Sequence, residues 1–352
     1  MAEVRVGLVG VGNCCSALVQ AVTLYGGPKG ASLEGIMHPE LGGYKVSDVR
    51  FVAAFDIDSR KVGRDLSQAI FSPPNDAPLI SEVPALGVKV VKGPVLDGVG
   101  PFSKDVLEVD ASPPAQVAEE LRRSRADVVV NMTPSGAVKA TEFYAGEAVR
   151  AGCGFVNATP NRIASRKAWA KRFKEAKLPL VGDDLMDQVG STILHRAIFE
   201  TLNRRGVHVD RSYALDVGGG AENLNALDRD RNVLKRRIKA ASIMSSLPYP
   251  VPVTAGTTDY VEFLRNERTS YLWIEGHFLA GTPVVIDAKF TTADAPNGVN
   301  LLLDAIRGVK IGLDRGLSGP LNEVSAYGFK SPPKPMAEAE ALARFNAFVK
   351  RR

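Results

Sequence analysis

The first 200 residues alternate between short apolar runs and longer segments in which apolar positions have helical spacing. The runs VRVGLVG (4–10) and FVAAFDID (51–58) have the continuous apolar character of buried strands. Helical spacing follows each of them, in NCCSALVQAV (13–22) and SRKVGRDLSQAI (59–70). Further apolar runs, with helical segments such as 136–152 between most of them, lie at 88–93, 126–132, 154–158 and 178–182. This alternation predicts an α/β domain with a doubly wound parallel sheet.

The pattern changes after about residue 207. SYALDV (212–217), SYLWIEGHFL (270–279) and PVVIDAKFTT (283–292) alternate apolar and polar positions, and no crossover helix separates the last two. This is typical of an antiparallel sheet with one covered face. A long helical segment at 298–316 then predicts a return to the first domain, before an extended piece and a final helix. We therefore expect a first α/β domain, an inserted α+β domain and a C-terminal return, with the limits 1–206, 207–297 and 298–352.

Composition places the chain among ordinary globular proteins. Hydrophobic residues make up 45% of its 352 residues and charged residues 24%, and the net charge is +5. The positive charge is spread along the chain, which predicts an anionic small-molecule ligand and no nucleic-acid partner. No apolar run approaches the roughly 20 residues that span a bilayer, and the first residues lack the order of a signal peptide. The cysteines (Cys14, Cys15 and Cys153) are too few for a disulfide framework, which predicts a cytoplasmic protein, and without a Cys/His cluster no metal site is expected.

The glycine-rich stretch GLVGVGNCC (7–15) stands where the first strand meets the first helix. Gly10 permits a tight turn and Gly12 lets the backbone approach a pyrophosphate at the helix N-terminus. Cys15 occupies the third glycine position of this fingerprint, and Asp56, at the end of the second strand, is placed for the ribose hydroxyls. Their spacing, 56 − 12 = 44, exceeds the usual ~20, so residues 26–48 form an insertion. The alternative is a tight turn that holds no ligand. We predict a Rossmann-like NAD-binding domain that uses Gly10, Gly12, Asn13, Cys14 and Asp56.

Two Asn- and Thr-rich segments follow the fourth and fifth strands. NMTPSG contains Thr133 and NATPN contains Asn157. Loops at the carboxyl ends of parallel strands border the cofactor crevice, so we predict that these two residues bind the nicotinamide ribose and amide. For Ser135 and Asn161, in the same segments, a plain helix N-cap explains the sequence equally well.

A stripe of cations lies in NVLKRRIKAASIM (232–244). Lys235 and Lys239 are four residues apart, which places both on one face of a helix. Such a stripe is usually a solvated face, and the alternative is a site for a phosphorylated, electron-rich substrate.

Four further stretches distinguish this chain from a generic dinucleotide-binding protein. They are VGDDLMDQVGSTILHR, LDVGGGAENLNALDRDRNVLKRRIK, TTADAPNGVN and VSAYGFKSPP. Together with the glycine-rich stretch and FVAAFDID, they resemble the myo-inositol-1-phosphate synthases, particularly the shorter bacterial and archaeal branch, from about residue 4 to 333. The resemblance implies a homotetramer with tightly held NAD. It also implies conversion of glucose 6-phosphate to inositol 1-phosphate by oxidation at C5, enolisation, intramolecular aldol closure and re-reduction.

The resemblance also implies roles for individual residues. Lys235 and Lys239 match the paired lysines of the family, and Lys330 in YGFKSPP matches a lysine that reaches the pocket from the C-terminal segment. Ammonium groups there stabilise the negative charge on the C5 oxygen and then on the oxygen at C1. Asp184 in GDD and Asp294 in ADAPN are implied near the nicotinamide. Substrate contacts are implied for Asn225 and for Lys289, which is otherwise an outward side chain on a strand.

Some positions depart from the family pattern. Met186 and Arg268 replace lysines, and Gly220 and Glu222 replace an asparagine and an aspartate. Arg268 keeps the charge but cannot release a proton at neutral pH, so we expect it to bind an oxyanion or phosphate. These changes fall on the sugar-binding residues. A synthase that forms a five-membered cyclitol phosphate from fructose 6-phosphate therefore remains an alternative, as do a plain NAD-dependent sugar-phosphate dehydrogenase and a non-catalytic NAD-sensing module.

Overall fold

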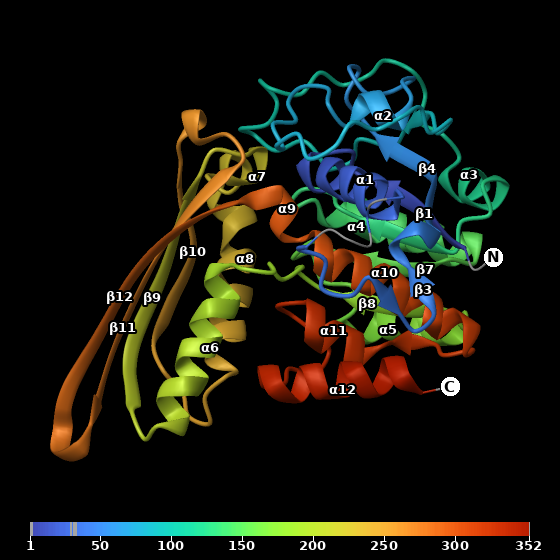
Figure 1. Ribbon diagram of the computed structural model, residues 1–352. Coiled ribbons are helices and arrows are strands. Elements are labelled where there is room, and N and C mark those ends of the chain that lie inside the picture. The colour runs from blue at the N-terminus through green and yellow to red at the C-terminus, as the bar shows by residue number, and fades with distance from the viewer. Residues whose placement is uncertain (1–2, 29, 31–33, 352) are drawn as a thin grey trace.

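The computed structural model describes residues 3–28, 30 and 34–351, which form two β-sheets with their covering helices (Figure 1). The larger sheet has seven strands, all parallel, in the order β13-β8-β7-β6-β1-β4-β5. This confirms the predicted α/β class with a doubly wound parallel sheet. The strands are β1 (Val4–Val9), β4 (Val49–Asp56), β5 (Val90–Lys92), β6 (Val128–Asn131), β7 (Gly154–Asn157), β8 (Pro179–Gly182) and β13 (Gly319–Pro320).

Helices cover both faces of this sheet, which explains why its strands read as continuous apolar runs. One face packs against a core that draws on α1 (Asn13–Gly26), α10 (Val299–Asp314), α11 (Asn322–Gly328) and α12 (Glu338–Lys350). The other face packs against α3 (Val117–Arg123), α4 (Val138–Ala151) and α5 (Lys167–Glu175). Since α10 contacts β1, β6, β7 and β8, the chain returns to the first sheet after the second one is complete.

The segment after β4 differs from the sequence prediction. We expected a helix over residues 59–70, and the structure has only the short α2 (Leu66–Ala69). Gly63 adopts a positive φ of 87°, which interrupts a helix. Asp65 then caps α2 by accepting a hydrogen bond from the Ser67 N–H at 2.9 Å. The helical spacing of the apolar residues was therefore overridden by local turn chemistry.

The long interval before Asp56 contains little regular structure. Its described part holds a hairpin of β2 (Glu40–Leu41) and β3 (Tyr44–Lys45), followed by the 3₁₀ turn η2 (Val46–Asp48). Part of the predicted insertion, residues 29 and 31–33, lies outside the described residues.

The second sheet has four strands in the order β10-β9-β11-β12 and extends away from the first (Figure 1). As expected, β11 pairs antiparallel with both β9 and β12, whereas β10 joins β9 in parallel through a helical crossover. Its inner face packs against α6 (Ser191–Arg204) and α8 (Arg229–Met244). Its strands are β9 (His208–Gly218), β10 (Val253–Tyr260), β11 (Glu267–Phe278) and β12 (Thr282–Ala293). The short helices α7 (Ala221–Asn225) and α9 (Asp294–Asn297) flank the end of the sheet nearer to α1. The 3₁₀ turns η3 (Glu262–Leu264) and η4 (Leu279–Gly281) connect its consecutive strands.

The helices in the described part of the chain were compared with the requirements for a membrane span. None of them combines the length and the apolar character needed to cross a bilayer.

Candidate active site

A cavity of about 320 Å³ lies between the carboxyl ends of the first-sheet strands and the near end of the second sheet. The glycine turn after β1 and the loops after β4 and β6 form one end of the cavity. Residues of α7, α8, β11 and α9, together with Lys330, form the other end. Ligands of doubly wound proteins bind at this edge of the sheet. The cavity therefore brings together segments that lie far apart in the sequence.

The glycine turn forms a cradle at the N-terminus of α1. Gly10 has a φ of 87°, and a Cβ atom there would lie 2.8 Å from the Met132 carbonyl oxygen. A Cβ atom on Gly12 would meet no atom within 4 Å, so this position opens into the cavity. The first turn of a helix has unpaired backbone N–H groups. The cradle consequently has the space and the N–H donors that a pyrophosphate requires.

Asp56 ends β4 and borders the cavity beside the glycine turn. Its carboxylate accepts hydrogen bonds from the backbone N–H groups of Val11 at 2.6 Å and Ile57 at 2.7 Å. Lys61 binds the other side of the turn, because its Nζ donates to the Val11 carbonyl at 2.8 Å and to Asn75 Oδ1 at 2.9 Å. Lys61 was not predicted, since no motif distinguishes it from a surface lysine. These contacts fix the position of the Asp56 carboxylate relative to the glycine turn.

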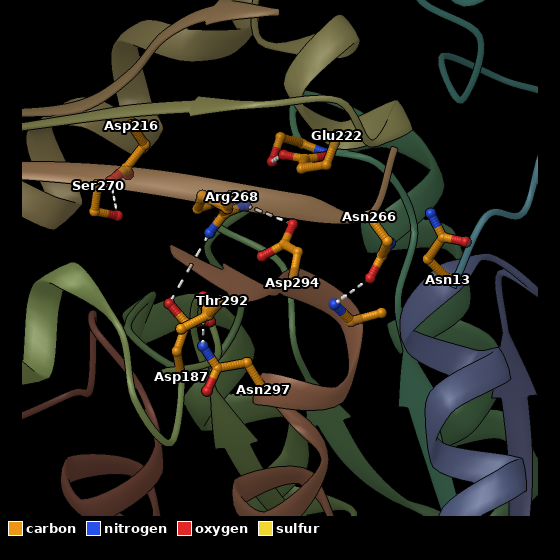
Figure 2. Close-up of polar contacts among 12 residues, drawn as sticks. Asn13, Asp187, Asp216, Glu222, Asn266, Arg268, Ser270, Thr292, Asp294 and Asn297 are labelled. Atoms are coloured by element: carbon orange, nitrogen blue, oxygen red, sulfur yellow. Dashed lines mark hydrogen bonds and ion pairs between the residues drawn. The ribbon is translucent and has the colours of Figure 1, made fainter. Parts of the chain in front are cut away.

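Asn13 supports the cavity through a network that joins the two parts of the protein. Its Oδ1 accepts hydrogen bonds from the N–H groups of Asp76 at 2.8 Å and Ala77 at 3.0 Å. Asp76 Oδ1 accepts from Asn13 Nδ2 at 2.5 Å and from Asn266 Nδ2 at 3.2 Å. Asn266 Oδ1 in turn accepts from the Ala295 N–H at 2.9 Å (Figure 2). The Asn13 side chain is therefore committed to loop positioning, and Asn266 is a cavity residue that the sequence did not reveal.

The next residue, Cys14, also borders the cavity. Although the side chain is exposed, desolvation at the cavity wall, together with the charge of Asp294, raises the pKa of its thiol above the ordinary value. The thiol is therefore protonated at neutral pH.

Thr133 and Asn157 occupy different environments. Thr133 borders the cavity, and its hydroxyl lies 3.0 Å from that of Thr141. Asn157 is fully buried outside the cavity lining, where its Nδ2 donates to Asp183 Oδ1 at 2.7 Å and to the Asn161 carbonyl at 2.5 Å. The structure therefore places Asn157 as a support for the loops beneath the cavity.

Lys235 reaches the cavity from α8 and pairs with Glu222 of α7. Its Nζ lies 2.8 Å from Glu222 Oε1, and Ser135 also hydrogen bonds to this carboxylate. Although burial opposes the charge of Glu222, Lys235 and Ser135 keep the pKa of its carboxyl below the ordinary value. The N-cap of α4 is Ala137, so Ser135 is not that cap.

Lys239 lies one helical turn further along α8 and does not line the cavity. Its Nζ donates to Asp216 of β9 and to Ser191 of α6. Burial lowers the pKa of Lys239, whereas Lys239 keeps the pKa of Asp216 below its ordinary value in spite of burial. The spacing of four residues did place both lysines on one helix face, but only Lys235 opens into the cavity.

Arg268 is the second residue of β11 and lies at the centre of a group of carboxylates (Figure 2). Its Nη2 donates to Asp294 Oδ2 at 2.7 Å, and its Nη1 lies 4.0 Å from Asp187 Oδ2. Although burial opposes the positive charge, Asp294 and Asp187 raise the pKa of Arg268. Burial raises the pKa of Asp294, because it outweighs the favourable charge of Arg268. Asp187 was not predicted from the sequence.

Lys330 reaches the cavity from the segment after α11. Its Nζ donates to the Leu185 carbonyl at 2.7 Å and lies 3.7 Å from Asp184 Oδ1 and 3.9 Å from Asp187 Oδ2. Although burial opposes its charge, Asp187 and Asp184 raise the pKa of Lys330. Burial raises the pKa of Asp184 in spite of Lys330. The Lys330 N–H also donates to the Asp184 carbonyl at 2.7 Å, which ties the C-terminal segment to the loop after β8.

Several buried polar atoms around the cavity lack a protein partner. They are Asp184 Oδ2, Asn225 Oδ1 and Arg268 Nε. Asn225 uses its other amide atom, Nδ2, to donate to the Ser135 carbonyl at 2.8 Å. Unpaired buried polar atoms are costly, so their presence on residues that line one cavity is typical of a site for a polar ligand.

Two sequence-selected residues lie outside the cavity lining. Lys289 is exposed on β12, with its Nζ 5.5 Å from the centre of the Tyr271 ring. Met186 is buried, with 2% of its surface exposed, and its N–H donates to the Gly328 carbonyl at 2.9 Å. Among the described residues, no group of three or more His, Cys, Asp or Glu is arranged to hold a metal ion.

Comparison with known proteins connects this geometry to one family. The family model described as Myo-inositol-1-phosphate synthase matches residues 190–295. The inositol-3-phosphate synthase of Mycolicibacterium smegmatis is 42% identical, covering 99% of this chain and 98% of that protein, and that of Mycobacterium tuberculosis is 41% identical, covering 99% and 96%. The crystal structure of Ari2 matches with a TM-score of 0.79 and 33% identity, covering 99% of this chain and 100% of Ari2. A myo-inositol-1-phosphate synthase-related protein from Thermotoga maritima has the same fold, with a TM-score of 0.79 at 22% identity over 99% and 98% of the two chains.

Proposed function

Because the chain belongs to the myo-inositol-1-phosphate synthase family, whose members are intramolecular cyclases, we propose that it converts glucose 6-phosphate to myo-inositol 1-phosphate with NAD as cofactor. The observation that carries the proposal is the convergence of Lys235, Arg268 and Lys330, from three distant segments, on a cavity that begins at the glycine turn. Amines and a guanidinium beside a dinucleotide cradle suit a keto-sugar intermediate that develops negative charge.

The residues at the glycine turn fit NAD. Gly10 and Gly12 leave room for a pyrophosphate at the start of α1, and the fixed carboxylate of Asp56 would accept hydrogen bonds from the adenosine ribose. Thr133, Cys14 and Asp294 border the space between this turn and the cations. Bound NAD supplies reversible hydride transfer at C5 of the sugar.

The cations act on the oxygen charge that develops after oxidation. A 5-keto sugar loses a proton from C6, and the resulting enolate attacks the C1 carbonyl carbon. Lys330 and Lys235 border the cavity as ammonium donors for the C5 and C1 oxygens. Arg268 remains protonated, so it stabilises anionic oxygen without exchanging protons. Proton transfer to and from the sugar is therefore assigned to the lysines and to Asp184, a cavity-lining carboxyl whose pKa is raised by burial.

Lys239 acts behind this group. Its ion pair with Asp216 lies next to Ser191, and Asp216 also accepts a hydrogen bond from Ser270 of β11 at 2.7 Å (Figure 2). We assign Lys239 a positioning role, because its network links α6, α8, β9 and β11 directly behind the cations that line the cavity.

The outer face of the second sheet suits a homotetramer. Tyr213 and Trp273 stack there with ring centres 5.5 Å apart, and Tyr271 and Val285 are 39% and 55% exposed. Exposed aromatic and apolar residues on one sheet face favour association with further copies. Light scattering of the eluting protein tests this: a mass near four times 37.6 kDa supports the tetramer, and a monomeric mass excludes it.

Incubation with NAD and each hexose 6-phosphate tests the proposed reaction. Inositol phosphate formed from glucose 6-phosphate, identified by mass and ¹³C NMR, is the expected product. Formation of a five-membered cyclitol phosphate from fructose 6-phosphate would show that fructose 6-phosphate, and not glucose 6-phosphate, is the substrate. Stoichiometric NADH absorbance without a carbocycle would instead indicate a plain dehydrogenase.

A further inference from the structure

The carboxylate of Asp187 lies in the cavity between two cations without a hydrogen bond to either. Its Oδ2 is 4.0 Å from Arg268 Nη1 and 3.9 Å from Lys330 Nζ, beyond hydrogen-bond distance (Figure 2). The side chain is 18% exposed and borders the cavity. It is therefore held by charge while its oxygens remain available.

The neighbouring groups are already engaged with other partners. Arg268 donates to Asp294 at 2.7 Å, and Lys330 donates to the Leu185 carbonyl at 2.7 Å. Glu222 is bound by Lys235. Among the side-chain hydrogen bonds of the described residues, none ends on the Asp187 carboxylate. The Asp184 carboxylate also accepts no side-chain hydrogen bond among the described residues, but it is only 6% exposed. With 18% exposure, Asp187 is thus the more accessible negatively charged acceptor that this cavity leaves for a ligand.

The backbone around Asp187 is fixed in place. The Met186 N–H donates to the Gly328 carbonyl at 2.9 Å, and the Gln188 N–H donates to the Asn297 carbonyl at 2.7 Å. Gly190 packs directly against the carboxylate, because a Cβ atom there would lie 2.5 Å from Asp187 Oδ2. The position of this carboxylate is consequently set before a ligand binds.

We propose that Asp187 is a specificity-determining residue that accepts a hydrogen bond from one hydroxyl group of the sugar phosphate. This rests on the proposed function and names one of its substrate contacts. A carboxylate accepts hydrogen bonds from hydroxyl donors and repels a phosphate, so it selects a hydroxyl of defined position and directs the phosphate away. Arg268 and Lys330 lie outside hydrogen-bond distance of Asp187, so the N–H groups that they do not use for Asp294 and the Leu185 carbonyl remain available to anionic oxygen.

The test measures coupling between the residue and individual hydroxyl groups. Glucitol 6-phosphate and its 2-, 3- and 4-deoxy forms are titrated calorimetrically into NADH-loaded enzyme, in which hydride transfer from the ligand cannot occur. Wild type, Asp187→Ala and Asp187→Asn are compared, with Glu119→Gln, an exposed acid on α3, as the matched control. A hydrogen bond to a charged acceptor predicts that Asp187→Ala weakens glucitol 6-phosphate binding about tenfold or more, with a smaller loss for Asp187→Asn.

One deoxy ligand is expected to bind wild type about tenfold more weakly than glucitol 6-phosphate does. On Asp187→Ala, the same deoxy ligand and glucitol 6-phosphate are expected to bind with equal affinity. Such loss of additivity identifies the hydroxyl that Asp187 contacts. Equal weakening of every ligand by Asp187→Ala, or no binding to wild type, would overturn the inference. Product formation by wild type is measured separately. A cyclitol phosphate obtained alongside fully additive binding would therefore refute the role of Asp187 and leave the proposed function standing.

Discussion

The two ends of the cavity are built from different parts of the polypeptide. The end around Gly10, Gly12 and Asp56, proposed to bind NAD, is called the cofactor end, and the end around Lys235, Arg268 and Lys330, proposed to bind the sugar, is called the substrate end. At the cofactor end, backbone atoms form the site: Gly10 turns the chain, Gly12 leaves open space, and the N–H of Val11 donates to Asp56. At the substrate end, side chains from distant segments form it, and Lys330 and Arg268 are each surrounded by carboxylates. Backbone geometry is set locally, whereas the substrate end exists only after the whole chain has folded.

In the proposed function, this difference separates the residues that bind NAD from those that act on the sugar. The polar groups that hold the cofactor end together are paired with one another, which fixes its shape before a ligand binds. The substrate end retains unpartnered atoms on Asp184, Asn225 and Arg268. Burial raises the pKa of Asp184 and Asp294 there, and the neighbouring carboxylates raise that of Arg268 in spite of burial. Perturbed titratable groups in a cleft are typical of reactive sites. Substitutions at the two ends should therefore affect different steps.

The largest expected effect follows from removing an amine at the substrate end. Lys330→Met keeps the length of the side chain and removes its charge, and we expect kcat to fall about 1000-fold, as when an oxyanion donor is lost. Lys235→Met should behave similarly, while the Kd for NAD changes less than threefold. Steady-state product formation and calorimetric NAD binding measure the two quantities. A kcat loss below tenfold for both variants would contradict the division of roles.

The next effect should appear at the cofactor end. Gly10→Ala introduces a Cβ atom 2.8 Å from the Met132 carbonyl at a φ of 87° and displaces the turn. We expect the Kd for NAD to rise about 100-fold, as misplacement of a binding group by about 1 Å can cost that much. Gly43→Ala is the matched control, since its φ is 90° and nothing lies within 4 Å of the added atom. Equal effects of both substitutions would show that the contact with Met132 is unimportant.

A smaller change in cofactor choice is expected for Asp56→Asn. The amide retains an acceptor for the Val11 N–H but removes the charge that repels a 2′-phosphate. The preference for NAD over NADP should fall about tenfold, which corresponds to the strength of one charged hydrogen bond. Binding titrations with both dinucleotides measure this ratio, and an unchanged preference would remove Asp56 from the ribose site.

His195, which is buried near Lys239 behind the substrate end, should make the free energy of unfolding depend on pH. Burial, reinforced by Lys239, lowers the pKa of His195 from 6.5 to about 3. Between these values only the unfolded chain binds the proton, so stability is full above pH 6.5 and declines as the pH falls toward 3. From pH 7 to 5.5 wild type should lose about 1 kcal/mol of unfolding free energy that His195→Gln retains, as measured in urea. Equal losses in the two proteins would mean that His195 is accessible to water in the folded protein and that its pKa is not lowered.

The smallest effect is expected at Lys289. Its side chain is exposed on β12 and lies outside the cavity lining, although the family resemblance implied a substrate contact. Lys289→Met should therefore change kcat/KM by less than about twofold, in the range of ordinary surface substitutions, and it serves as the exposed-lysine control for Lys330→Met. A loss above tenfold would place β12 at the site, for example through a second subunit.

The cofactor end was largely predictable from the sequence, for physical reasons. A strand, a glycine turn and a helix are consecutive, so the position of Gly10, Gly12 and Asp56 follows from local pattern and strand order. The parallel sheet and the antiparallel pairs of the second sheet also follow from hydrophobic periodicity. The helix expected over residues 59–70 did not form, because turn chemistry at Gly63 and Asp65 is invisible to periodicity.

The substrate end was predictable only through family resemblance and only in part. Helical spacing puts Lys235 and Lys239 on one face, but tertiary contacts with Glu222 and Asp216 decide which of the two opens into the cavity. Asp187 and Asn266 act through partners far away in the sequence, so no local spacing indicates their role. Long-range pairing of charges is a property of the folded chain.

In the proposed reaction, the substrate is oxidised, closed into a ring and reduced again within one cavity. Glucose 6-phosphate carrying deuterium at C5, incubated with stoichiometric unlabelled NAD, tests it most directly. We expect a cyclitol phosphate that retains the deuterium on the former C5 carbon, detected by mass and ²H NMR. Deuterium found in released NADH, together with an open-chain ketone product, would contradict it.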